Sequence, residues 1–140
     1  MHHNPPIRVS AVVLIDDDGR VALVRKRHTR FFIFPGGKPE LGEDGVTAAV
    51  REVHEELGVL LDAATLHHLG DYNTPAANEA GTELFSQVYQ ARLPAGRPVT
   101  AQAEIAELIW VKLNNVELST ATELAPLSAM ILEEMARLSS

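Results

Sequence analysis

The chain has 140 residues and a mass of 15.2 kDa, which is the size of one ordinary domain. Twelve Lys and Arg against nineteen Asp and Glu give a net charge of −7, which disfavours non-specific binding to a nucleic acid backbone or to anionic lipid. The chain contains no cysteine, which excludes disulfides, thiol catalysis and zinc–thiolate sites.

The beginning of the chain carries no apolar stretch of signal-peptide length. No run in the sequence approaches the roughly 18 apolar residues that a membrane-spanning helix needs. We therefore expect a cytoplasmic protein that has neither a membrane nor a nucleic acid among its partners.

The first part of the chain predicts β-structure. Residues 7–15 are β-branched and almost continuously apolar, which is typical of a buried central strand. A turn at 16–19 and a second strand at 21–24 complete a predicted hairpin. The short aromatic segment 31–34 follows, and we expect the sequence Pro-Gly-Gly at 35–37 to interrupt it.

Two helices and three more strands are predicted after the glycines. Apolar residues at steps of three and four indicate an amphipathic helix that Gly58 ends: Val46, Ala49, Val50, Val53 and Leu57. Strands are expected near 65–72, 83–91 and 108–113, and a second amphipathic helix at 123–138. This order predicts an α/β (α+β) fold in which one mixed sheet lies between helices, as a single domain over residues 1–140.

The predicted first helix is unusually acidic on one side. Glu52, Glu55 and Glu56 fall within an arc of about 100° on a helical wheel, next to the apolar stripe. This face is either a solvated acidic surface, on which Arg51 pairs with Glu55, or a site for a hard cation such as Mg²⁺ or Mn²⁺. The two glycines before the helix favour the cation site, because glycine lets the backbone approach a ligand closely.

These residues resemble the Nudix hydrolase signature, G-x5-E-x7-R-E-U-x-E-E-x-G-U, in which U is a bulky aliphatic residue. The positions that the signature specifies are filled without a gap by Gly37, Glu43, Arg51, Glu52, Val53, Glu55, Glu56, Gly58 and Val59. In compactness the chain is similar to the MutT-like branch of that family. The resemblance implies an α/β/α sandwich with its Nudix box at 37–59.

The resemblance also implies an activity, the Mg²⁺-dependent hydrolysis of a nucleoside diphosphate derivative by attack of water on phosphorus. Mn²⁺ is the alternative metal. The implied metal ligands are the carboxylates of Glu52, Glu55 and Glu56 and the carbonyl of Gly36. Arg51 is expected to orient these carboxylates.

The same resemblance implies roles for further acidic residues. Glu43 is expected to brace the loop against the helix. Glu52 is the first choice for the general base, although some members of the family use a glutamate on a later loop. In the corresponding part of this chain we prefer Glu104 to Glu107 as a further metal ligand, and a surface glutamate at a strand entrance is the alternative interpretation.

Contacts to the substrate are expected from three parts of the chain. The segment 72–81 is long for a connection between paired strands, and it contributes Tyr72 and Asn78 as candidates. Phe32 is a candidate for stacking on a base, with core packing as the alternative. Arg25 belongs to a short basic cluster that either binds phosphates or is a solvated loop.

The preferred substrate is a small nucleotide, specifically a (deoxy)nucleoside triphosphate, and ADP-ribose or a nucleotide sugar is the alternative. A non-catalytic nucleotide-sensing module is a further possibility, but it predicts substitutions among the three glutamates, and all three are present. An isomerase of isopentenyl diphosphate on the same scaffold would need a cysteine, which the chain lacks. We expect a monomer or a homodimer.

Overall fold

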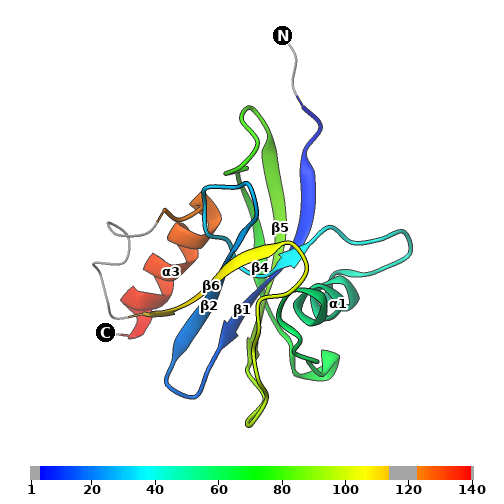
Figure 1. Ribbon diagram of the computed structural model, residues 1–140. Helices are drawn as coiled ribbons and strands as arrows, with labels where there is room; N and C mark the ends of the chain where they lie inside the picture. Colours follow the sequence, from blue (N-terminus) through cyan, green and yellow to red (C-terminus); the bar gives the residue numbers. More distant parts are fainter. Residues whose placement is uncertain (1–3, 114–122, 140) are drawn as a thin grey trace.

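A computed structural model describes residues 4–113 and 123–139, which form a mixed sheet with a helix on each face (Figure 1). The strands are β1 (Ile7–Ile15), β2 (Arg20–Lys26), β3 (Gly36–Gly37), β4 (His67–Pro75), β5 (Glu83–Arg92) and β6 (Ile105–Lys112). The helices are α1 (Gly45–Leu57), α3 (Pro126–Ser139) and a short 3-10 helix (Ala63–Thr65). The predicted fold class is confirmed.

Strand β1 is the centre of the sheet. The strand order is β4-β5-β1-β2-β6, and β3 pairs with β1 outside this path. Strand β1 runs parallel to β5 along its whole length and antiparallel to β2 and β3. The outer pairs, β4 with β5 and β2 with β6, are antiparallel. A strand with neighbours on both edges and a helix on each face is buried from both sides, which explains its continuous apolar sequence.

Alternate residues of β1 contribute to two separate hydrophobic cores. The core on the side of α1 includes Val12, Leu14, Ala49, Val53 and Leu57. The core on the side of α3 includes Ala11, Val13, Leu23, Leu127 and Ile131. The apolar stripe predicted for α1 therefore packs on the sheet, and the acidic face is left beside it.

Helix α1 has a side-chain cap at its start and a glycine cap at its end. The carboxylate of Asp44 accepts a hydrogen bond from the backbone N–H of Thr47 at 2.8 Å. Gly58 adopts a left-handed conformation with φ of 70°, and its N–H donates to the carbonyl of His54 at 2.9 Å. The predicted helix and its terminating glycine are confirmed, and His54 in its last turn is exposed.

The expected break at 35–37 is wrong in one respect. Gly36 and Gly37 form the two-residue strand β3, which pairs with Ala11 and Ser10 of β1. Among the described residues, the nearby aromatic segment 31–34 makes only isolated bridges, in which Ile33 pairs with Val24 and Phe32 pairs with Leu124. The glycines are therefore fixed to the central strand.

Several predicted boundaries move when tertiary contacts are present. The strand expected at 65–72 is β4 (His67–Pro75), because residues 63–65 form a 3-10 helix that Asp62 caps through Ala64. The strand expected at 108–113 begins earlier, at Ile105, where it pairs with Lys26 of β2. The extension of β4 shortens the connection to β5, which covers 76–82.

The last helix begins at Pro126 instead of residue 123. Proline is well suited to the first position of a helix, because the N–H it lacks has no partner there. The residues before it are held in another way: the N–H of Phe32 donates to the carbonyl of Glu123, and the N–H of Ala125 donates to the carbonyl of Phe32.

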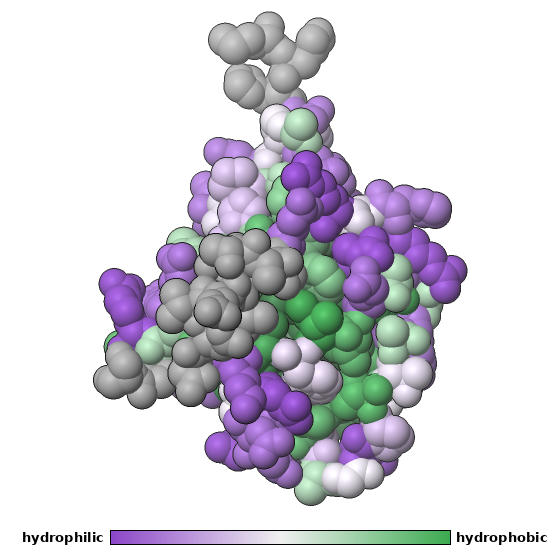
Figure 2. Space-filling view, turned by 60° about the vertical axis from the view of Figure 1, so that its left-hand side comes forward, coloured by the Kyte–Doolittle hydropathy of each residue, from purple (hydrophilic) through white to green (hydrophobic). Residues whose placement is uncertain are grey.

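The molecular surface is not uniformly charged. On the face of the molecule that Figure 2 shows, apolar side chains gather in one area, and polar side chains lie around them. Among the half-buried apolar residues on the α1 side of the sheet is Trp110, which packs against the core. Within the described residues, no helix is long and apolar enough to cross a membrane.

Candidate active site

The two glycines of β3 lie in very close contact with their surroundings. A Cβ atom on Gly36 would lie 2.0 Å from the carbonyl oxygen of Ser10, and its φ of 150° disfavours other residues. A Cβ atom on Gly37 would lie 2.5 Å from the carboxyl carbon of Glu52. The two glycines therefore let the chain pass between the central strand and the acidic face of α1.

Arg51 holds the acidic residues around it in an ion-pair network. Its guanidinium donates to both carboxylate oxygens of Glu43, at 2.8 and 2.9 Å, and to Glu52 at 2.9 Å. It also donates to the carbonyl of Lys38 at 3.1 Å and contacts Glu55 at 3.3 Å. The hydrogen bonds from Arg51 lower the pKa of Glu43 to about 2, so this carboxylate is ionised at neutral pH.

Glu56 is the deepest of the acidic side chains. It is 2% exposed, and its Oε1 accepts a hydrogen bond from the N–H of Gly36 at 3.3 Å. Its Oε2 is buried and has no hydrogen-bond partner among the described residues. Burial raises the pKa of Glu56 to about 8, and the neighbouring carboxylate of Glu52 adds to this shift.

A buried oxygen without a partner, next to a second carboxylate, is the environment in which a cation would be favourable. Glu56 and Glu52 provide such a pair, and the backbone of Gly36 lies against it. Mg²⁺ prefers carboxylate and carbonyl oxygens, so the donors fit this ion.

The structure does not bring all three predicted glutamates together. Glu55 is 51% exposed and directed to Arg51, whereas the side chain of Glu52 is only 15% exposed. Within the described ranges, no group of three or more His, Asp or Glu side chains has an arrangement that would hold a metal ion. In this structure Glu55 is a partner of Arg51, which is the alternative interpretation stated for it from the sequence.

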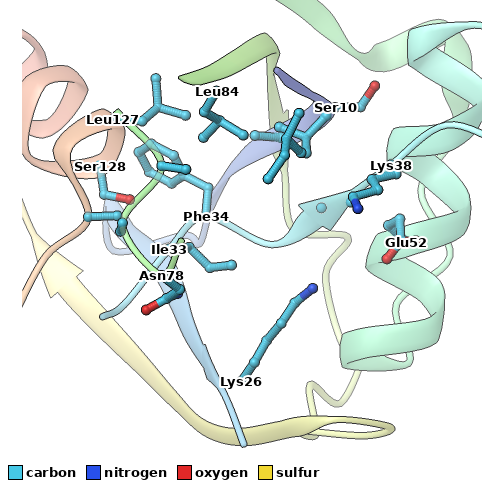
Figure 3. Close-up of a pocket in the computed structure, with 18 of the residues that line it drawn as sticks. Ser10, Lys26, Ile33, Phe34, Lys38, Glu52, Asn78, Leu84, Leu127 and Ser128 are labelled. Carbon is cyan, nitrogen blue, oxygen red and sulfur yellow. The ribbon is translucent and has the colours of Figure 1, made fainter. Parts of the chain in front are cut away.

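A cavity of about 500 Å³ lies beside Glu52, whereas Glu55 and Glu56 are not among the described residues that line it. It extends from α1 and β3 to the first turn of α3, and the connection between β4 and β5 forms another wall. Lys26, Lys38 and Glu52 lie at one end of this cavity, whereas Phe34, Leu127 and Ser128 lie at the other (Figure 3). The cavity therefore has a charged end and a neutral end.

The predicted substrate contacts are only partly found at this cavity. Asn78 lines it. Phe32 is 9% exposed and belongs to the core on the α3 side, and Tyr72 packs against the same core. Arg25 donates to Glu107 at 2.6 and 2.8 Å and to the carbonyl of Thr29. The structure places none of Phe32, Tyr72 and Arg25 among the described residues that line the cavity.

The two candidate glutamates before β6 have different neighbours. Glu104 lines the cavity and forms an ion pair with Lys26 at 3.2 Å. Glu107 pairs with Arg25 and is not among the described cavity residues. Of the two, Glu104 is the residue at the cavity, where its carboxylate pairs with Lys26, and its role as a metal ligand stays a prediction.

The signature does not identify Lys38 and Ser128 as cavity residues. Lys38 follows Gly37 directly but fills none of the positions that the signature specifies. Ser128 lies in the first turn of α3 and is buried because that helix packs on the sheet. The amphipathic pattern of the sequence does not show on its own that this serine is buried.

Comparison with protein families gives a match between the NUDIX domain and residues 5–133. Among curated proteins, an ADP-ribose pyrophosphatase of Methanocaldococcus jannaschii is 31% identical over 83% of this chain and 67% of its own length. A Bacillus subtilis protein named "Putative 8-oxo-dGTP diphosphatase" is 28% identical over 71% of this chain and 62% of its own. An isopentenyl-diphosphate Delta-isomerase of Cutibacterium acnes is 30% identical over 78% of this chain and 61% of its own length.

This chain spans 61–68% of the length of the curated relatives it matches. Among solved structures, the crystal structure of a MutT protein from Methanosarcina mazei has a TM-score of 0.78. The two sequences are 20% identical, and the superposition covers 100% of this chain and 99% of the MutT protein. The likeness therefore shows a shared fold.

Proposed function

Because the chain belongs to the NUDIX family, we propose that it hydrolyses the pyrophosphate bond of a nucleoside diphosphate derivative with Mg²⁺. The substrate we propose is a (deoxy)nucleoside triphosphate, and ADP-ribose or a nucleotide sugar is the alternative. The observation that carries this proposal is the buried Oε2 of Glu56, which has no hydrogen-bond partner among the described residues and lies beside Glu52, a residue that lines the charged end of the cavity. We assign residues 1–140 to one cytoplasmic Nudix domain, monomeric or homodimeric.

The proposed metal ligands are Glu52, Glu56 and the carbonyl of Gly36. Glu55 is the third proposed carboxylate, and it has to leave Arg51 to reach the metal. A bound Mg²⁺ would polarise the phosphoryl oxygens and lower the pKa of a bound water. Mn²⁺ accepts the same oxygen donors and is the proposed substitute.

The other charged residues complete the proposed site. Lys26 and Lys38 bring positive charge to the cavity in a chain of net charge −7, and they would attract the phosphates. Arg51 would keep Glu52 oriented while Glu43 fixes Arg51 in turn. Glu52 is the proposed general base, since it lines the cavity where substrate and water would meet.

The relatives support different substrates. The Bacillus subtilis protein supports the triphosphate, and the archaeal ADP-ribose pyrophosphatase supports the alternative. The isomerase of Cutibacterium acnes is similar to this chain to the same degree, but the chain lacks the cysteine that we associate with that chemistry.

The test is a hydrolysis assay with identification of the products, in Mg²⁺ and in EDTA. The panel contains the dNTPs, ADP-ribose, NADH, diadenosine polyphosphates and isopentenyl diphosphate. We expect a nucleoside monophosphate and pyrophosphate from the dNTPs, and no turnover in EDTA. Cleavage of ADP-ribose alone would overturn the preferred substrate, and isomerisation without hydrolysis would overturn the proposed function.

A matched pair of variants tests the site itself. Glu52→Gln should lower kcat by a factor of about 100 or more, because it removes a proposed ligand and base. Glu134→Gln changes an exposed glutamate on α3 in the same way and should leave kcat unchanged. If Glu52→Gln retains full activity, the carboxylates of α1 are not the catalytic site.

A further inference from the structure

Ser128 has a hydroxyl that the fold does not use. The residue is 1% exposed, and its Oγ has no hydrogen-bond partner among the described residues. Leaving a buried hydroxyl unpaired has a cost of about 1–3 kcal/mol, so such groups in native proteins call for an explanation. Ser128 lines the cavity, with its hydroxyl on the cavity side of α3 (Figure 3).

Other unpaired hydroxyls in the structure lack this position. Thr74 and Ser86 are buried without a partner, but neither is among the described residues that line the cavity. Ser10 does line it, but its hydroxyl points away from the space between the two helices (Figure 3). Ser128 is therefore the unpaired hydroxyl that a molecule in the cavity would meet.

The start of α3 makes this end of the cavity a hydrogen-bond donor. Pro126 is the first residue of a 14-residue helix, and Ala125, Leu127 and Ser128 line the cavity beside it. The first N–H groups of a helix have no partner within the helix, and its N-terminal end carries partial positive charge. This favours a ligand atom that accepts hydrogen bonds over one that donates them.

The remaining walls are suited to a flat neutral group. Apolar side chains surround this end, including Phe34, Leu84 and Leu127, and Asn78 provides a polar group (Figure 3). Lys26, Lys38 and Glu52 lie at the other end (Figure 3). A nucleotide whose phosphates lie at the charged end would therefore place its base at the neutral one.

We propose that Ser128 and the first turn of α3 select a nucleobase that carries a carbonyl oxygen over one that carries an amino group at the same position. This specificity rests on the proposed function, because it assumes that the cavity binds a nucleotide. Inosine and adenosine nucleotides form a suitable pair for comparison, since the six-position of the base carries a carbonyl oxygen in one and an amino group in the other.

The first experiment measures binding and does not depend on hydrolysis. Calorimetry with IMP and AMP in Mg²⁺ should give a Kd for IMP at least about tenfold lower, the effect of one well-formed hydrogen bond to a buried group. Ser128→Ala should bring the two Kd values to within about threefold. Ser128→Thr, which keeps the hydroxyl, should retain the preference.

Ser86→Ala is the matched control, because it removes an equally buried and unpaired hydroxyl away from the cavity. It should leave the preference for IMP unchanged. Neither alanine variant should lower the free energy of unfolding, since each removes an unpaired polar group. A marked loss of stability in Ser128→Ala would show that the hydroxyl has a structural role and would overturn the proposal.

The second experiment compares hydrolysis of ITP and ATP. The preference should appear in kcat/KM, mainly through KM, and should vanish in Ser128→Ala. Equal Kd values for IMP and AMP in the wild-type protein, absence of binding by either, or a preference that survives Ser128→Ala would each overturn the assignment. Tighter binding of IMP without any hydrolysis would instead contradict the proposed function and leave this specificity in place.

Discussion

The buried carboxyl of Glu56 leads to a prediction about stability as well as activity. Its pKa is raised by burial from 4.5 to about 8, so in the metal-free protein the native state holds a proton that the unfolded state releases. Where the native state binds more protons, the free energy of unfolding falls as pH rises. The native protein should therefore lose stability between these two pKa values.

Glu56→Gln removes this dependence because an amide does not ionise. From the two pKa values, the free energy of unfolding of the wild type should fall by about 4 kcal/mol more than that of the variant between about pH 5 and about pH 9. Urea unfolding in EDTA at the two pH values measures the difference. The variant should be the more stable protein at the higher pH.

Glu55→Gln is the control for this experiment. It lies on the same helix one residue earlier, but its carboxylate is half-exposed and paired with Arg51. An exposed ion pair contributes little, so its stability relative to wild type should change by less than about 1 kcal/mol between the two conditions. If Glu56→Gln also shows a constant difference from wild type, Glu56 is not a buried, desolvated carboxyl, and the argument for a cation beside it is refuted.

Three further predictions concern the same region. Excess Mg²⁺ should raise the Tm of the wild-type protein, and Glu52→Gln should abolish the rise; an equal shift in both proteins would place the ion elsewhere. The ionised form of Glu43 is stabilised by Arg51 and has a pKa of about 2, so its contribution to stability is complete above pH 4.5 and is lost as the pH falls through 2. The difference in free energy of unfolding between wild type and Glu43→Gln should therefore become smaller as the pH is lowered. If urea unfolding gives the same difference at every pH, this prediction is contradicted. Gly36→Ala should destabilise the protein by about 3 kcal/mol or more, measured by urea unfolding, because its Cβ would lie 2.0 Å from the carbonyl of Ser10.

The sequence predicts most of the fold because its strongest patterns are local. The periodic apolar residues and the terminating Gly58 predict α1 without knowledge of any partner, whereas the cap by Asp44 is seen only in the structure. The apolar run of β1 likewise indicates a central strand. The ends of β4 and β6 were misplaced because they depend on pairing with strands distant in sequence.

The candidate site was predicted only in part for a similar reason. The signature locates Glu52, Glu55 and Glu56, and the helical spacing also allows the pair of Arg51 with Glu55, but the sequence does not decide between that pair and a metal ligand at Glu55. Whether Phe32 is directed to the cavity or to a core depends on which face of the sheet α3 covers. The role we propose for Ser128 depends on the packing of α3 and on a hydroxyl left unpaired, and neither feature can be seen in the sequence.

The pairing of β1 also has a consequence for synthesis on the ribosome. Strand β1 is made first, but its parallel partner β5 follows about 77 positions later in the register, or about 4–15 s at common translation rates. During this interval β1 has one edge without a neighbouring strand. Strand β3, which lies next to α1, is then paired with a sheet that still lacks β5. A nascent chain arrested before residue 83 should therefore be a substrate for chaperones that bind exposed apolar segments, whereas a released chain that includes β5, β6 and α3 should not.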